Sequence, residues 1–220
     1  MHRSFIFLAE GFEEIEALTV IDVMRRAGMD IKSVSITDSK LVAGAHGITV
    51  ETDLTFKEAD FSDSEWLICP GGMPGASNLH SFNALSDLLR VHKGKIAAIC
   101  AAPGVVLAPL GLLNGKEATC YPGFEGPCKE NGAIMRDVPV MSTENLITGN
   151  GPSAALRFDS RQQHGRKRSP GGRRSHAFLS QKHELLLLIN RLKSRRSNTQ
   201  NLSSQRKKNR PRPGPILFSL

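Results

Sequence analysis

“KIAAICAAPGVVLAPLG”, residues 95–111, is apolar over most of its length and carries a cysteine at its centre. Its first six residues predict a buried strand, and Pro103 suits the first turn of a helix that follows. Cys100 then lies at a helix N-terminus, where the dipole lowers a thiol pKa and the N–H of Ala101 is free to bind an oxyanion. The alternative is a small buried hydrophobe, which is what free cysteines often are.

Short β-rich runs alternate with helical patterns on both sides of this stretch. Strands are expected at 4–9, 31–37, 47–53, 65–72, 95–100, 116–121 and 138–149, and helices near 13–27 and 83–92. This alternation of apolar strands with helices predicts an α/β fold with a parallel sheet and helices on both faces. Ligands bind at the carboxyl ends of such strands, so the functional residues are expected there.

The loop after the fourth of these strands is rich in glycine. “CPGGMPGASN” (69–78) has three glycines and two prolines in the six positions from Pro70 to Gly75. Such a loop can turn tightly and present backbone N–H groups to an anion, although an ordinary strand-to-helix turn explains it equally well. No Gly-Lys-Ser/Thr follows, so it is not a phosphate-binding P-loop.

A carboxylate interrupts the apolar side of the first predicted helix. That side is formed by Ala17, Val20, Val23, Met24 and Ala27, and Glu16 projects into it. Burial would raise the pKa of Glu16, and a protonated carboxyl can donate a hydrogen bond to sulfur or oxygen. The alternative is that Glu16 reaches solvent at the edge or caps a loop. Glu14 projects to the opposite side, which is expected to be solvated.

The balance of basic and acidic residues changes sharply after residue 158. Residues 159–220 hold 16 lysines and arginines against 2 acidic residues, and residues 1–158 hold 13 against 19. We therefore expect one α/β domain over 1–158 and a basic, disordered, low-complexity tail over 159–220. A shifted reading frame is favoured as the origin of the tail over a natural basic arm. Binding of nucleic acid by this tail is only weakly indicated.

The remaining composition points to a cytoplasmic protein without a metal site. The four cysteines form no CxxC pair and have no accompanying histidines, so no zinc site is expected. The first residues carry too short an apolar run for a secretory signal. No stretch reaches the ~18 apolar residues that a membrane span needs. Cys69, Cys120 and Cys128 are expected to be inert.

Four segments together resemble the ThiJ/PfpI superfamily, in the branch that holds DJ-one and the bacterial YajL proteins. The resemblance runs from residue 4 to residue 158. It is carried by “LAEGFEEIEALTVIDVMRRAGM” (8–29), “CPGGMPGASNL” (69–79), “IAAICAAPGVVLAPLGLLNG” (96–115) and “TGNGPSAALRF” (148–158). The resemblance implies a flavodoxin-like fold and a homodimer formed through the first helix, near Met24, Arg25 and Arg26. After Phe158 the tail departs from the family, which continues there with an amphipathic helix.

The resemblance also implies a site. Cys100 matches the family's reactive cysteine, and Glu16 matches the protonated glutamate that hydrogen-bonds its sulfur. Gly72 and Ala101 match the backbone donors of the oxyanion site, beside Gly71.

Two positions depart from the residues found in other members of the family. The first departure is from the human-type members. Tyr121 in “TCYPGF” stands where those members have a histidine, so a Cys–His pair is not assured. His46 stands where relatives often have arginine. It is either a residue that lines a site or an ordinary loop histidine.

Two functions follow from the resemblance. One is a cofactor-independent glyoxalase or deglycase that acts on 2-oxoaldehydes such as methylglyoxal, or on their adducts, with Cys100 as nucleophile and Glu16 moving protons. The other is a redox sensor or chaperone in which Cys100 is oxidised to sulfinate without turnover. The same residues serve both, so the sequence does not separate them.

Overall fold

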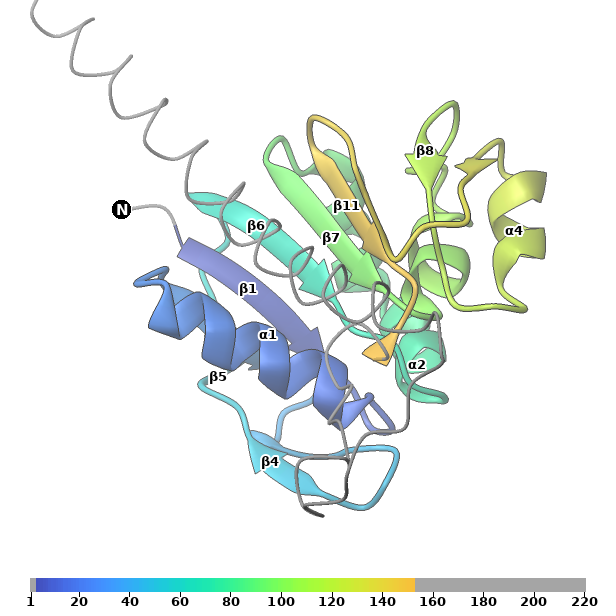
Figure 1. The fold of residues 1–220 in the computed structure, drawn as a ribbon. Helices are drawn as coiled ribbons and strands as arrows, with labels where there is room; N and C mark the ends of the chain where they lie inside the picture. The colour runs from blue at the N-terminus through green and yellow to red at the C-terminus, as the bar shows by residue number, and fades with distance from the viewer. Residues whose placement is uncertain (1–2, 153–220) are drawn as a thin grey trace, which may run out of the picture.

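The computed structural model describes residues 3–152, and a seven-stranded sheet forms their centre (Figure 1). The strand order is β10-β11-β7-β6-β1-β2-β5, and every pairing is parallel except that of β10 with β11. The strands are β1 (Arg3–Leu8), β2 (Ile31–Ser35), β5 (Leu54–Thr55), β6 (Ser64–Cys69), β7 (Lys95–Ile99), β10 (Val140–Ser142) and β11 (Leu146–Gly149).

Helices cover both faces of the sheet, as the sequence predicts. Helix α1 (Glu14–Arg26) packs on one face, and α2 (Gly75–Ser81), α3 (Asn83–Val91) and the helical turn η1 (Pro103–Leu107) pack on the other. The alternation of β1 explains this arrangement, because Phe5 and Phe7 join the core under α2 and α3 while Ile6 and Leu8 join the core under α1. The α/β, flavodoxin-like prediction is confirmed.

Three expected strands differ from those observed. The run 47–53 gives β4 (Thr49–Glu51), which pairs with β3 (Leu41–Ala43) in a separate hairpin. The run 116–121 gives the short β8 (Glu117–Ala118), which pairs with β9 (Ile134–Met135) outside the main sheet. The run 138–149 is wrong as a single strand. It folds back on itself as the antiparallel pair β10–β11, because the polar stretch between them forms a turn.

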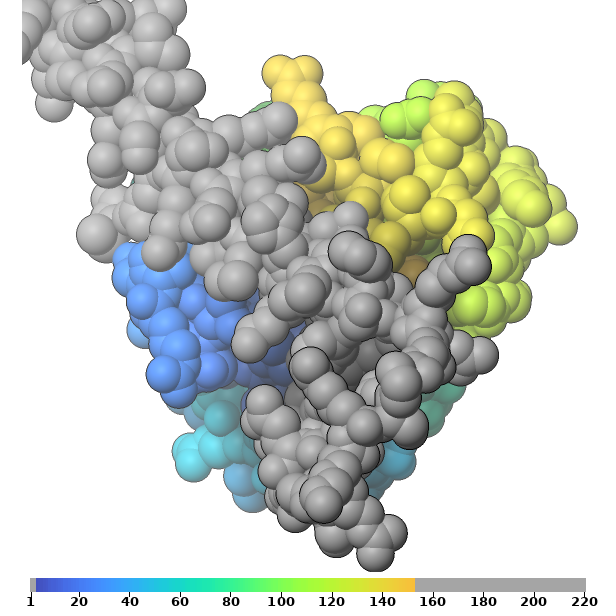
Figure 2. Space-filling view, viewed as in Figure 1, coloured from blue at the N-terminus to red at the C-terminus, as the bar shows by residue number. Residues whose placement is uncertain are grey.

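The small elements lie at one side of the molecule. The short helix α4 (Glu125–Glu130) and β8 stand beyond the end of the sheet that β10 and β11 form (Figure 1). Figure 2 shows α1, in blue, and the yellow-green to orange segment that includes α4 and β11 on opposite sides of the same face.

The predicted tail 159–220, its possible nucleic-acid binding and the domain boundary at residue 158 lie outside the described residues. Within 3–152, no helix is both long and apolar enough to cross a membrane.

Candidate active site

The site forms where β7 ends and the chain turns into η1. Cys100 has a φ of 61°, and it is the single non-glycine residue between 3 and 152 in the left-handed region. Its N–H donates to the carbonyl of Gly149 at 2.8 Å, and its carbonyl accepts from the N–H of Tyr121 at 2.8 Å. A sparsely populated conformation held from both sides is common at functional elbows, where it turns the side chain out of the strand.

Two backbone N–H groups point at the Cys100 sulfur. They belong to Ala101 and Gly72, and both favour the thiolate. Gly72 reaches this position with a φ of +89°, and a Cβ on it would lie 2.6 Å from the carbonyl oxygen of Gly11. Only glycine tolerates both the conformation and the close approach. The structure therefore brings the two predicted backbone donors to the predicted thiol.

Glu16 lies on the inner side of α1, 2 % exposed. Its Oε2 accepts a hydrogen bond of 2.7 Å from the N–H of Gly71, and its own N–H donates to Oε2 of Glu13 at 2.7 Å. Oε1 is buried and has no hydrogen-bond partner of ordinary geometry among residues 3–152. Glu16 also interacts with the Cys100 thiol, so a buried carboxyl with one free oxygen stands beside the sulfur.

Burial dominates the proton affinities of this pair. It raises the pKa of Glu16 to about 7, although the Gly71 N–H and the thiol act in the opposite direction. Burial, followed by the charge and hydrogen bond of Glu16, raises the pKa of Cys100 to about 12. The N–H of Ala101 at the helix end acts in the expected direction, but the expectation of a lowered pKa is wrong, because the net pKa is raised. Two N–H groups and a five-residue helical turn do not offset desolvation beside a carboxylate.

Two glycines, Gly71 and Gly151, lie close to the Cys100 side chain. A Cβ on Gly71 would lie 2.7 Å from Cβ of Cys100 and 2.8 Å from Oε2 of Glu16. A Cβ on Gly151 would lie 3.0 Å from Cδ2 of Tyr121 and 3.8 Å from the Cys100 sulfur. The sequence analysis missed Gly151. Its signal was present, since Gly151 follows the carboxyl end of a predicted strand in “TGNGP”.

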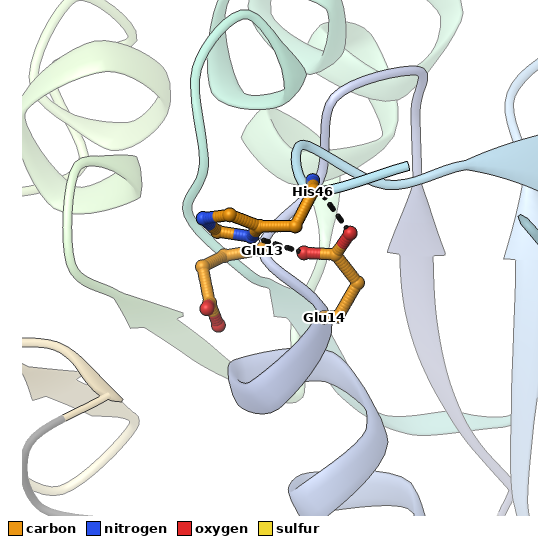
Figure 3. A group of neighbouring side chains, drawn as sticks. All are labelled: Glu13, Glu14 and His46. Atoms are coloured by element: carbon orange, nitrogen blue, oxygen red, sulfur yellow. Dashed lines mark hydrogen bonds and ion pairs between the residues drawn. The ribbon is translucent and has the colours of Figure 1, made fainter. Parts of the chain in front are cut away.

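Glu14 and His46 form an ion pair on the other side of this helix end (Figure 3). The N–H of His46 donates to Oε1 of Glu14 at 2.7 Å, and its Nδ1 lies 2.8 Å from Oε2. Burial would raise the pKa of Glu14, but these hydrogen bonds outweigh it and hold the pKa below its ordinary value. The expected exposure of Glu14 is wrong, because it is 3 % exposed.

His46 hydrogen-bonds with Glu14, and none of its hydrogen bonds among residues 3–152 reaches the Cys100 thiol. The His46 side chain is 70 % exposed. Together with Glu13 these residues offer three possible metal-ligand atoms within 4.8 Å of one another. Both oxygens of Glu14 are already occupied by His46, so the group has the geometry of an ion pair.

The proposed dimer segment is only partly on the surface. Met24 is 4 % exposed and packs in the core, whereas Arg25 and Arg26 lie outside and pair with Asp53 and Asp22. Met24 is therefore wrong as a contact residue, because it faces the sheet.

Comparison with known proteins places this geometry in a family. A family model described as the DJ-1/PfpI family matches residues 2–162. The protein dj-1beta of Drosophila melanogaster is 32 % identical over 158 residues, which cover 70 % of this chain and 84 % of that protein. A protein named glutathione-independent glyoxalase DJ-1, from Schizosaccharomyces pombe, is 30 % identical over 169 residues, 72 % of this chain and 87 % of that one. The oxidised DJ-1 structure of Toxoplasma gondii superposes with a TM-score of 0.66 at 34 % identity, covering 70 % of this chain and 85 % of that chain.

Proposed function

The chain belongs to the DJ-1/PfpI family, and on that premise we propose that it is a cofactor-independent glyoxalase acting on 2-oxoaldehydes such as methylglyoxal, or on their adducts. The observation that carries the proposal is the pairing of the Cys100 thiol with the buried carboxyl of Glu16. The name of the Schizosaccharomyces pombe relative supports the same chemistry.

The pair supplies a nucleophile and a proton carrier at once. Because the pKa of Glu16 is about 7, the pair loses one proton near neutral pH and keeps the other. Oε2 is occupied by the Gly71 N–H, so the remaining proton is exchanged between Oε1 of Glu16 and the sulfur. With the proton on Oε1, the sulfur is a thiolate that faces the N–H groups of Ala101 and Gly72.

The reaction then needs only these groups and water. The thiolate adds to the aldehyde carbon, and the carbonyl electron pair becomes an alkoxide that takes the proton from Glu16. The Glu16 carboxylate next removes the hydrogen of that carbon as a proton, which gives an enediolate with its charge on the neighbouring oxygen. Glu16 returns this proton to the neighbouring carbon, and the hydroxyl proton of the first carbon passes to the neighbouring oxygen. The product is a thioester on Cys100. Hydrolysis by water releases a 2-hydroxy acid and the free thiol.

The test is the loss of methylglyoxal without glutathione, followed together with lactate formation. We expect turnover by the parent chain and none by Cys100→Ser. Cys69→Ser is the matched control, because Cys69 is also a buried thiol but ends the neighbouring strand β6. Equal lactate formation by the parent and Cys100→Ser, or none by the parent, would contradict the proposal.

A second function, redox sensing, is favoured by the donors that surround the sulfur. Oε1 of Glu16 is a buried polar atom without an ordinary partner, and two N–H groups point at the same sulfur. A sulfinate on Cys100 would accept hydrogen bonds from all three once Glu16 is protonated. Peroxide treatment that stops at a gain of two oxygens on Cys100 in the parent, but continues to sulfonate in Glu16→Ala, would support this function.

The dimer is proposed to form through the outward side of α1. Leu18 is 39 % exposed there, and Arg25 and Arg26 extend from the same helix. Light scattering of the parent and Leu18→Glu tests this, with a halved mass expected in the variant. The cytoplasmic location stays a prediction.

A further inference from the structure

Two further cysteines lie together at the edge of the core that holds Cys100. Cys120 follows β8 and is 5 % exposed, and Cys128 lies in α4 and is fully buried. Both are free thiols that belong to the same hydrophobic core as Cys100. The Cys120 thiol donates a hydrogen bond to the sulfur of Cys128. Two adjacent buried thiols are therefore held in contact by the fold.

The backbone around the pair is well fixed. The N–H of Phe124 donates to the carbonyl of Tyr121 at 3.1 Å, which closes the turn between the two cysteines. The carbonyl of Cys128 accepts from Ala133 at 3.0 Å. Close packing continues on the far side, where a Cβ on Gly104 would lie 3.6 Å from the Cys128 sulfur. The contact of the thiols thus follows from the fold of the segment.

We propose that Cys120 and Cys128 are a redox modification site that forms a reversible intramolecular disulfide when the protein meets a hydroperoxide. The hydrogen bond from Cys120 lowers the pKa of Cys128, so the Cys128 thiolate attacks the peroxide oxygen and the O–O bond breaks. The products are a sulfenic acid on Cys128 and, with hydrogen peroxide and the proton that Cys128 released, one water.

Cys120 completes the reaction. Its sulfur, which hydrogen-bonds with Cys128 in the reduced protein, attacks the sulfur of the sulfenic acid. The S–S bond forms, and the hydroxyl leaves with the thiol proton of Cys120 as a second water. The two thiols lose two electrons and two protons, and the peroxide takes up both.

The position of the pair connects it to the site. Tyr121 directly follows Cys120, and its N–H binds the carbonyl of Cys100 at 2.8 Å. A disulfide at Cys120 therefore forms one residue away from the segment that supports the reactive thiol. This site is independent of the proposed glyoxalase activity, since neither thiol takes part in that reaction.

A single tryptic digest distinguishes a Cys120–Cys128 disulfide from oxidation of Cys100. Trypsin cleaves after Lys116 and Lys129, so peptide 117–129 holds both Cys120 and Cys128, whereas peptide 96–116 holds only Cys100. The folded full-length chain is treated with hydrogen peroxide, unfolded in N-ethylmaleimide and digested. We expect peptide 117–129 to lose two hydrogens and to carry no maleimide, and dithiothreitol to restore both thiols.

Single cysteine variants identify which two residues form the disulfide. Cys120→Ser and Cys128→Ser should each lose the disulfide, and Cys69→Ser should keep it. The parent measurement needs no variant, so the proposal stays testable if a variant fails to fold. The proposal is overturned if both cysteines of peptide 117–129 are still alkylated at a peroxide dose that already oxidises peptide 96–116.

Discussion

The backbone N–H of Gly71 donates a 2.7 Å hydrogen bond to Oε2 of Glu16, joining residues that are 55 positions apart in the sequence. This bond fixes one carboxyl oxygen on the loop after β6 and leaves Oε1 buried without an ordinary partner. In the proposed mechanism, Oε1 is therefore the oxygen that exchanges a proton with Cys100. The predictions below depend on this geometry.

Glu16→Gln should lower kcat by about 10²-fold or more, the usual contribution of a general acid–base group. The amide oxygen can still accept from Gly71, but the NH₂ group cannot take up a proton. Glu14→Gln is the matched control, because Glu14 is equally buried on the same helix but pairs with His46. It should retain most of the parent kcat. Equal losses in both variants would show that burial of a carboxyl, and not proton transfer, is what matters.

The rate should depend on the ionisation of Glu16. Since its pKa is raised to about 7, the pair lacks its negative charge below that pH. We expect kcat/KM to rise with pH through about 7 and then level off. In Glu16→Gln this rise should disappear, because the carboxyl that titrates near 7 is gone. The variant also removes the charge of Glu16 that helps to raise the pKa of Cys100, so any remaining rise reports the thiol alone, whose pKa burial still raises. A profile that is flat between about pH 5 and about pH 9 in the parent is incompatible with this assignment.

Gly71→Ala should lower activity and stability, because it adds one methyl group between Cys100 and Glu16. The new Cβ would meet Cβ of Cys100 and Oε2 of Glu16 at contact distances of 2.7 and 2.8 Å, so the two groups must separate. We expect a loss of about 10²-fold in kcat and about 1–3 kcal/mol in the free energy of unfolding. Gly126→Ala is the control, since its Cβ meets nothing within 4 Å and Gly126 lies in α4. Full activity of Gly71→Ala would contradict the close packing.

The Glu14–His46 pair should make stability depend on pH. The hydrogen bond and charge of Glu14 raise the pKa of His46 above 6.5, so the pair stabilises the fold fully below 6.5 and this contribution is lost as pH rises through the raised pKa. The pKa of Glu14 is lowered, so on the acid side the contribution is present above 4.5 and is lost as pH falls further.

A double-mutant cycle with His46→Gln and Glu14→Gln measures this coupling by thermal unfolding. The coupling should be larger at about pH 6 than at about pH 9. A coupling that does not change between these pH values would mean that a hydrogen bond of the neutral His46 ring, and not its charge, holds Glu14.

The sequence by itself predicted the fold class and two of the central residues. Alternating apolar strands and helices leave few ways to bury both faces of a sheet. Pro103 after an apolar run places Cys100 at a strand-to-helix turn, and Glu16 interrupts the apolar side of its helix. The structure brings these two groups together, while their catalytic roles stay predictions.

Only the tertiary structure decided what covers each residue. Glu14 projects away from the apolar side of α1, but the loop after β3 places His46 over it. Cys120 and Cys128 come from separate short elements with no shared motif, and their contact depends on how α4 packs. Hydrophobic periodicity reports which side of an element faces the core, whereas burial and proton affinity depend on the segment that packs against it, which can lie anywhere in the chain.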